Sequence, residues 1–393
     1  MTRTVILGAA RTAFGRFGGT LKDIPAVQLG GIAIEGALGR AGVPAELVDY
    51  VAMGMVLHAG TGQIPARQAA HRAGIPYQVP ADTIDKVCAS SLRAVNLVDA
   101  LIRAGEVQVA VAGGMENMSS GPYLIPRARW GYRLGNGELV DSTVKDGLWC
   151  PFWDRHMGNH GDAMAREYGI SRREQDEWAY RSQMRVKHAQ ERGWLAEEIV
   201  PVEVAQKKGP PVTFDRDEHP RPDTTLEKLA QLRPAFSPDG TVTAGNAPGI
   251  NDGAAAVVLA SEDKARELGS EPLATIIATG SASAQPEQLG LVAALAGRRA
   301  LERAGVRDED VHLIEVNEAF AVVVLTCLKI TGWDPDKVNV NGGAIALGHP
   351  IGASGARILL TLVYELRRRG GGIGLACICS GGGQGEATLI RVD

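Results

Sequence analysis

The chain has 393 residues, of which 45% are hydrophobic and 22% are charged, so it can form two or three globular domains with sizeable cores. Its formal net charge of −4 argues against a nucleic-acid-binding protein, and no apolar run approaches the roughly 18 residues of a membrane span. The five cysteines are an odd number in a long chain, which disfavours a disulfide framework and favours a reducing, cytoplasmic compartment.

The beginning of the chain, residues 1–15, lacks the apolar stretch of a signal peptide, and we interpret it as a first strand. Residues 32–48 then predict a helix that ends in Arg-Ala-Gly-Val, and residues 295–311 repeat that pattern. A second match is between CASSLR at residues 88–93 and GASGAR at residues 352–357, and each leads into a helix and a strand. Chance similarity of two α/β units is the alternative, but the shared order and spacing predict two similar halves packed as a pseudo-dimer.

The stretch between the halves, residues 123–246, holds five of the six tryptophans and many prolines, glycines and charges. We interpret it as a long insertion that carries binding function. Ser171 and Glu174 form a capping-box pattern at the start of a polar helix. Within residues 125–143, Gly-Asn-Gly between apolar flanks predicts a hairpin of two short strands. Residues 251–268 return to a strand and then a helix.

The stretch Val338–Arg357 has the pattern of a strand, a glycine-rich loop and a helix. Alternating Val338 and Val340 predict the strand, and the helix is expected from Ala353 onward. A loop of this kind leaves backbone N–H groups free to hold an anion, and His349 within it can exchange protons near neutral pH. The alternative is an ordinary α/β turn with a structural histidine.

Two cysteines stand at the ends of predicted strands. Cys88 closes an apparent strand at residues 83–87 and opens a helix that Ser90 and Ser91 are expected to cap. A thiol at a helix N-terminus has a lowered pKa and is a nucleophile, whereas a lone buried cysteine is more often inert packing. Cys379 ends the last strand, before SGGGQG, whose glycines let the backbone approach a ligand closely.

Asn317 lies where a strand at residues 311–316 meets a helix at residues 319–330. Its amide either caps that helix or holds a water or a substrate carbonyl. Cys377 and Cys379 share one strand face, but no second cysteine pair or paired histidines accompany them, so we expect no metal site.

Together these segments resemble the thiolase family from end to end. The matching pieces are VCASSLRAV around Cys88, GGMENMS at 113–119, HMG at 156–158, GTVTAGN at 240–246, INDGAA at 250–255, NEAF at 317–320, GGAIALGHPIGASGAR at 342–357 and CSGGGQG at 379–385. The resemblance implies an α/β fold in which duplicated βαβαβαββ halves form a layered αβαβα core. Residues 1–120 with 250–272 would form the N-terminal half, 273–393 the C-terminal half, and 121–249 an inserted loop domain for CoA binding and oligomerisation.

The resemblance also implies an acyl-CoA:acetyl-CoA C-acetyltransferase, which condenses two acetyl-CoA reversibly to acetoacetyl-CoA and CoA. Cys88 would carry the acyl group, His349 would take its proton, and Cys379 would be the acid and base at the α-carbon. Asn317, through a water, and His349 would form one oxyanion hole. The backbone N–H groups of Cys88 and Gly381 would form the other, as expected where two carbonyl oxygens develop charge. No metal or redox cofactor is expected.

Coenzyme A binding would fall mainly to the insertion. The residues that the resemblance assigns to the pantetheine and nucleotide path are His156, Met157, Arg221, Leu232, Phe236, Ala244, Ala319 and Phe320. Arg221 shares a loop with Lys207, Lys208 and Arg216, and the positive charges of this loop could bind the phosphates of CoA although the chain as a whole is acidic. Two positions depart from the family: Pro248 and Lys228 stand where biosynthetic members have serines that belong to the CoA site.

Three alternatives remain at this point. A degradative 3-ketoacyl-CoA thiolase of broader chain length is favoured by the pair Ser90-Ser91 and by Gln384. An NAD-dependent dehydrogenase would explain the glycine-rich loop but lacks a G-x-G-x-x-G pattern. A non-catalytic CoA- or lipid-binding protein conflicts with the complete set of candidate catalytic residues.

The loop RARWGYRLGNGELVDSTVKDGL is similar to one with which biosynthetic acetoacetyl-CoA thiolases assemble tetramers from dimers, and predicts a homotetramer.

Overall fold

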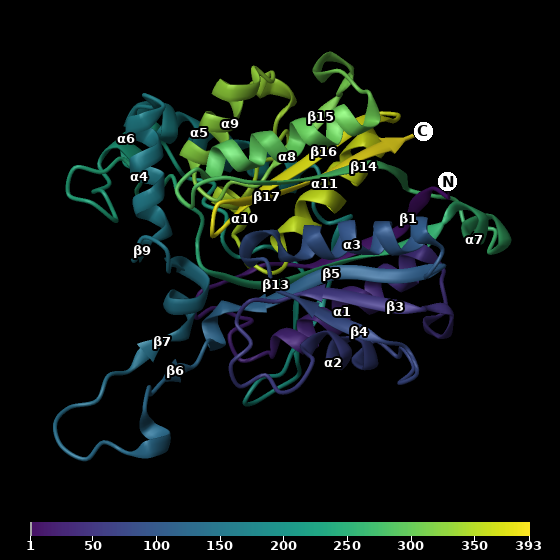
Figure 1. The fold of residues 1–393 in the computed structure, drawn as a ribbon, viewed down its shortest axis with the longest axis horizontal. Helices are drawn as coiled ribbons and strands as arrows, with labels where there is room; N and C mark the ends of the chain where they lie inside the picture. Colours follow the sequence, from purple (N-terminus) through teal and green to yellow (C-terminus); the bar gives the residue numbers. More distant parts are fainter. Residues whose placement is uncertain (1) are drawn as a thin grey trace.

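A computed structural model describes residues 2–393, and its centre is one long mixed β-sheet (Figure 1). Across the sheet the strands follow in the order β15 (Leu313–Val316), β16 (Gly372–Ser380), β17 (Gln384–Val392), β14 (Ala274–Ser283), β1 (Thr4–Thr12), β13 (Asn251–Ser261), β5 (Val109–Asn117), β3 (Tyr50–Gly54) and β4 (Ala81–Ile84). The short strands β2 (Gly15–Arg16) and β10 (Ile199–Val200) pair with β13 and β1. The two halves join where β1 runs antiparallel to β14, with Thr4 opposite Ile276.

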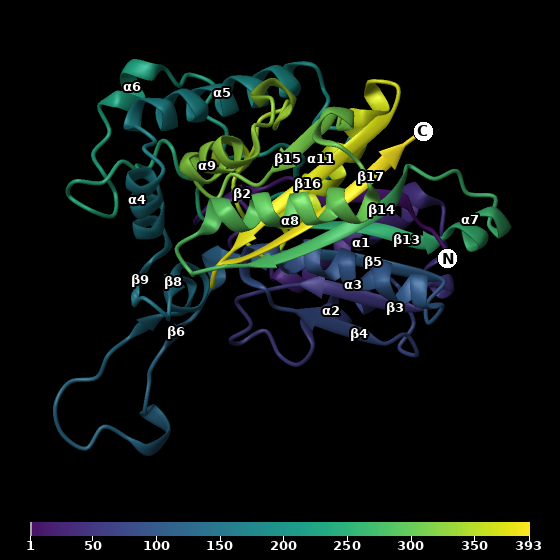
Figure 2. The ribbon, with the colours of Figure 1, turned by 45° about the horizontal axis from the view of Figure 1, so that its top comes forward.

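Helices cover the sheet in layers (Figures 1 and 2). On the outer face of the first half lie α1 (Ala26–Ala41) and α2 (Pro65–Arg72), and on that of the second half lie α8 (Leu289–Ala304) and α9 (Ala321–Thr331). Between the halves, α3 (Ser90–Ala104) packs against α11 (Ser354–Arg368) in a shared apolar core. The expected duplication and the αβαβα layering are therefore confirmed.

The contact between α3 and α11 explains the matched motifs CASSLR and GASGAR. Twelve of the fifteen residues of α11 are buried, as a central-layer helix requires. A side chain at Gly355 would lie 2.5 Å from the backbone nitrogen of Leu92, so only glycine permits this close approach. Ser91 does not cap α3 as expected; its Oγ accepts a hydrogen bond from the backbone N–H of Ala356, 2.9 Å away, across the interface. Ser90 instead accepts from the backbone N–H of Lys86 at 2.8 Å.

Other local predictions have mixed outcomes. The capping box of Ser171 and Glu174 is present at the start of α5 (Arg172–Glu191), and α7 (Glu262–Glu267) follows β13 as expected. The strand predicted at Val338 is wrong, since that residue forms only an isolated bridge with Ile314. Asn339 has a positive φ of 49°, and its side-chain amide bonds both the N–H and the C=O of Val316 at 2.8 Å. That amide pairs with the edge of the sheet in place of a backbone strand.

One segment of the insertion extends from the core as a long arm (Figures 1 and 2). The predicted hairpin is only partly correct, because β6 (Tyr123–Leu124) and β7 (Val140–Asp141) pair at the base of the arm, while its tip forms no ladder. Trp130 is 87% exposed and Leu134 is 96% exposed. The rest of the insertion contains β8 (Trp149–Cys150), β9 (Arg155–His156), α4 (Met157–Glu167), α5, β11 (Val202–Val204), β12 (Val212–Phe214) and α6 (Leu226–Ala230).

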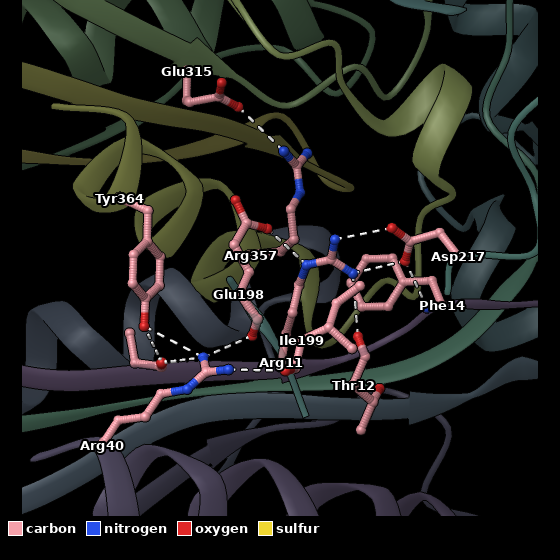
Figure 3. A network of polar contacts seen from close by, with 11 residues as sticks. Arg11, Thr12, Phe14, Arg40, Glu198, Ile199, Asp217, Glu315, Arg357 and Tyr364 are labelled. Atoms are coloured by element: carbon pink, nitrogen blue, oxygen red, sulfur yellow. Dashed lines mark hydrogen bonds and ion pairs between the residues drawn. The ribbon is translucent and has the colours of Figure 1, made fainter. Parts of the chain in front are cut away.

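A buried ionic cluster ties the insertion to the first strand of the core (Figure 3). The Arg11 guanidinium donates to both carboxylate oxygens of Asp217, at 2.7 and 2.9 Å, and to Glu198 at 2.8 Å. Next to it, Arg357 of α11 donates to Glu315 of β15 at 3.1 Å. Removing one member of such a cluster would leave an uncompensated buried charge, so these contacts fix the insertion on the core. Within residues 2–393, no helix combines the length and apolarity needed to span a bilayer.

Candidate active site

A pocket of about 370 Å³ opens where the two halves and the insertion meet. Residues from all three line it: Val87, Cys88, Met118, Gly147, Leu148, His156, Met157, His219, Arg221, Ala235, Phe236, Thr243, Ala244, Ala247, Pro248, Gly249, Ile250, Leu289, Ala319, Phe320, His349, Ile351, Cys379, Ser380 and Gly381. Most of these side chains are apolar, so the few polar groups decide what the pocket can hold and do.

Cys88 reaches the pocket from a 3₁₀ turn, Val87–Ala89, that precedes α3. Val87 has a φ of 43°, which is unfavourable for a β-branched residue and marks backbone strain beside the thiol. The turn is anchored to the second half, because Lys86 forms an ion pair with Glu386 of β17 at 2.7 Å. The strand expected to run to residue 87 ends earlier, at Ile84.

The expected lowering of the Cys88 pKa is wrong. Burial raises the pKa of the thiol to about 12, although hydrogen bonds from the backbone N–H groups of Gly381 and of Cys88 itself oppose the rise. Cys88 precedes α3 by two residues, and the cost of burying a thiolate outweighs the help from nearby N–H dipoles. The resting sulfur is therefore a protonated thiol with two N–H groups directed at it, and ionisation requires a base.

His349 is held in one tautomer by its neighbours. Its backbone N–H donates to Oδ1 of Asn251 at 2.9 Å, and its Nδ1 lies 2.6 Å from Oγ of Ser354. Because the Ser354 hydroxyl can donate to the carbonyl of Pro350 at 3.0 Å, we assign Oγ as the acceptor of the His349 contact and place the ring proton on Nδ1. Nε2 is then an unprotonated acceptor, and no group in the described chain bonds to it. Burial and the charge of Arg357 lower the pKa of His349 to about 3, which keeps the imidazole neutral.

Cys379 and Asn317 come from the second half. Cys379 lies at the end of β16 in the same pocket as Cys88, and burial raises its pKa well above the ordinary value, with the neighbouring Cys88 adding to the rise. Asn317 is fully buried between β15 and α9, and neither polar atom of its side chain has a partner among residues 2–393. A buried side-chain amide without hydrogen-bond partners is rare, and the amide of Asn317 is therefore available to bind a water or a ligand. Asn317 does not itself line the pocket.

Glu116 was not singled out from the sequence, although it lies in the motif GGMENMS. Its carboxylate accepts backbone N–H bonds from Val56 at 3.0 Å, Leu57 at 3.1 Å and Gly352 at 3.0 Å. Burial raises its pKa to about 8, against the effect of these three donors. Glu116 thereby fastens the loop that follows His349 to the first half of the protein.

Most of the residues expected to bind CoA lie together. His156 stacks on Phe236 with ring centroids 4.5 Å apart, and its Nδ1 accepts from the backbone N–H of Gly158 at 3.0 Å. The other residues placed in the pocket are Met157, Arg221, Ala244, Ala319 and Phe320. Leu232 lies instead in a shallow depression that shares Arg221 with the pocket.

The basic group expected around Arg221 has a different composition. Lys228 lies beside Arg221 in the shallow depression and pairs with Asp223 at 2.8 Å. Arg216 lines a separate depression with Asp215 and Asp217. The pocket also includes His219 and Leu289, which the sequence analysis missed. For His219, the signal was its position two residues before Arg221.

Among residues 2–393, no group of three or more histidine, cysteine or acidic side chains is arranged to hold a metal ion. The pocket offers instead a thiol with convergent N–H donors, a neutral imidazole and a second thiol. A thiol with a base can form and exchange covalent thioesters, and a second proton-transfer group can act on a neighbouring carbon.

Comparison with known proteins identifies the family to which this fold belongs. The family pattern described as "Thiolase, N-terminal domain" matches residues 4–263, and "Thiolase, C-terminal domain" matches residues 270–392. The chain belongs to the thiolase family.

Similar proteins cover the whole chain. The "Acetyl-CoA acetyltransferase" of Cupriavidus necator is 53% identical over 391 residues, and that of Pseudomonas aeruginosa is 52% identical over 393 residues. A "Probable acetyl-CoA acetyltransferase" of Escherichia coli is 50% identical over 393 residues. Each alignment spans 100% of this chain and 100% of the relative.

Proposed function

We propose that the protein is an acetyl-CoA C-acetyltransferase that interconverts two acetyl-CoA molecules with acetoacetyl-CoA and CoA. The observation that carries the proposal is that Cys88, His349 and Cys379 line one pocket while Nε2 of His349 is free to accept a proton. The names of the relatives, which share about half of their residues with this chain, support the same activity.

In the first half-reaction, Sγ of Cys88 attacks the thioester carbonyl of acetyl-CoA and its proton passes to Nε2 of His349. The carbonyl oxygen takes up negative charge, and we assign its stabilisation to the N–H groups of Cys88 and Gly381, which already point at the sulfur. The C–S bond to CoA then breaks, and the CoA thiolate takes the proton from His349. The product is acetyl-Cys88 and free CoA.

In the second half-reaction, the Cys379 thiol passes its proton to Nε2 of His349, and the resulting thiolate removes a proton from the methyl carbon of a second acetyl-CoA. The enolate oxygen is stabilised by protonated His349 and by Asn317 acting through a water. The carbanion attacks the acetyl group on Cys88, a C–C bond forms, and Cys88 leaves and takes its proton from His349, while Cys379 keeps the proton that it removed from the methyl carbon. Because burial raises the pKa of Cys379, its ionisation must accompany substrate binding. We assign no metal or redox cofactor to either step.

We assign CoA binding and oligomerisation to residues 121–249 and the catalytic groups to the two core halves. The segment at residues 125–143, which contains the exposed apolar arm, is our candidate for contacts that join two dimers into a tetramer, and we place the protein in the cytoplasm. The arguments for a degradative enzyme of broader chain length are weaker than the sequence indicated. Ser90, Ser91 and Gln384 do not line the pocket, and the two serines bond to backbone groups.

The test separates the half-reactions. Incubation with acetyl-CoA followed by intact mass analysis should reveal one acetyl group, which Cys88→Ala should abolish. Cys379→Ala should still be acetylated but should not form acetoacetyl-CoA, because the two steps use different proton acceptors. Acetylation of Cys88→Ala through a covalent intermediate would refute the assignment of the nucleophile. Thiolysis of 3-ketoacyl-CoA substrates of increasing length, compared by kcat/KM, decides between the acetoacetyl-CoA enzyme and the broader one.

A further inference from the structure

His219 is a polar pocket residue to which the proposed reaction gives no task. The arm of CoA carries amide groups, and each amide N–H that leaves water needs an acceptor. The pocket wall is largely apolar, and Pro248 offers neither an N–H nor a polar side chain. Among the polar residues of the wall, Nδ1 of His156 already accepts from Gly158, and Ser380 donates its hydroxyl to the carbonyl of Lys86 but can still accept through its oxygen.

The backbone aims His219 into the pocket next to Pro248. His219 precedes Pro220, so its backbone is biased toward an extended conformation. In an extended chain residues two apart point to the same side, and both His219 and Arg221 line the pocket. The ring packs against Gly249, where an added Cβ would lie 2.4 Å from Cε1 of His219. The glycine that follows Pro248 therefore makes the space that the imidazole occupies.

The ring has a defined hydrogen-bonding state. One ring nitrogen donates to the backbone carbonyl of Ile345, and burial together with the charge of Arg221 lowers the pKa of His219 to about 4. At neutral pH the imidazole is therefore uncharged and uses its single N–H on Ile345. Neither ring nitrogen is among the fully buried atoms that lack a partner in the described chain. The second nitrogen has no hydrogen bond of its own within the described chain and is not fully buried, so we assign it as an acceptor on the pocket surface that His219 lines.

We propose that His219 accepts a hydrogen bond from an amide N–H of the pantetheine arm of CoA, at the wall where Pro248 cannot form one. The proposal rests on the proposed function, since it assumes that CoA thioesters occupy this pocket. It makes His219 a binding residue for the pantetheine part of CoA, and it gives no proton-transfer role to this histidine.

The test measures CoA binding apart from catalysis. In the Cys88→Ala background, which cannot be acetylated, calorimetry gives the Kd of CoA. His219→Phe keeps a ring of similar shape but no acceptor, and it should weaken CoA binding about fivefold to tenfold, as expected for one lost hydrogen bond. His219→Gln, which retains an acceptor oxygen, should lose less, and Pro248→Ser added to His219→Phe should recover part of the loss. His188→Phe, at an exposed position outside the pocket, is the matched control.

Turnover supplies a second readout with Cys88 intact. His219→Phe should raise the KM for acetoacetyl-CoA and leave kcat nearly unchanged. It should also leave kcat/KM unchanged for acetoacetyl-ethanethiol, a thioester without amides. Unchanged CoA affinity, or equal losses on both thioesters, would overturn the role of His219. A wild-type protein that neither binds CoA nor becomes acetylated would instead refute the proposed function, so the two failures are distinguishable.

Discussion

Replacing Ser354 with alanine tests whether the tautomer of His349 is set by its neighbour. Ser354 is 1% exposed and His349 is 6% exposed, so water does not readily substitute for the hydroxyl that accepts the Nδ1 proton at 2.6 Å. Without that acceptor, the tautomer protonated on Nε2 is no longer disfavoured, and this form cannot take a proton from Cys88. A buried hydrogen bond contributes about 1–2 kcal/mol to this preference, so acetylation of Cys88 should slow by about tenfold.

The assay is single-turnover acetylation followed by rapid quench and mass analysis, with thermal unfolding to confirm that the variant is folded. A double-mutant cycle with His349→Asn supplies the control. Because Ser354 acts through His349, Ser354→Ala should have no further effect on acetylation once the imidazole is absent. An unchanged rate in the single variant, or an equal loss in both backgrounds, would show that the hydroxyl does not position the base.

Three further predictions follow from the same structure. His349→Asn should slow acetylation and condensation, each by about 10²–10⁴-fold, and an effect on condensation alone would remove its role as base for Cys88. Replacing residues 129–140 by a short glycine bridge should convert a tetramer into an active dimer, as measured by light scattering; a deletion variant that remains a tetramer would contradict the role of the arm. Acid should destabilise the protein: since the folded pKa of His349 is about 3 and the unfolded value is near 6.5, the unfolded chain binds the extra proton between these limits. The free energy of unfolding should therefore fall as pH is lowered through this window, and in urea titrations His349→Asn should remove up to about 1.4 kcal/mol per pH unit of that slope.

The layered core could be predicted from the sequence because it depends on local patterns that repeat. The helices α3 and α11 both follow small-residue motifs, and buried strands such as β16 are continuous apolar runs bounded by glycines. Where a side chain forms hydrogen bonds with a segment distant in sequence, the prediction made from the local pattern was wrong. Asn339 pairs with Val316 instead of continuing a strand, and Ser91 bonds to Ala356 instead of capping its own helix.

In the candidate site, too, the features set by local sequence could be predicted and those set by distant contacts could not. The sequence indicated Cys88, His349 and Cys379 through their positions at the ends of strands and in glycine-rich loops. It misled us about the pKa of Cys88, because burial is a property of the assembled protein and outweighs the local effect of the helix terminus. The anchoring role of Glu116 depends on three backbone groups that are far from it in the chain, so no local pattern reveals it.

The division of the pocket between the two halves has a consequence for how the protein becomes active during synthesis. Cys88 is translated with the first half, whereas His349 and Gly381 lie within residues 349–393. In the proposed mechanism, the Cys88 thiol lacks both its base and its second N–H donor until those residues emerge from the ribosome. The mechanism therefore predicts that a nascent or C-terminally truncated chain does not consume acetyl-CoA, and that acetyl transfer begins only when the last strands have joined the sheet.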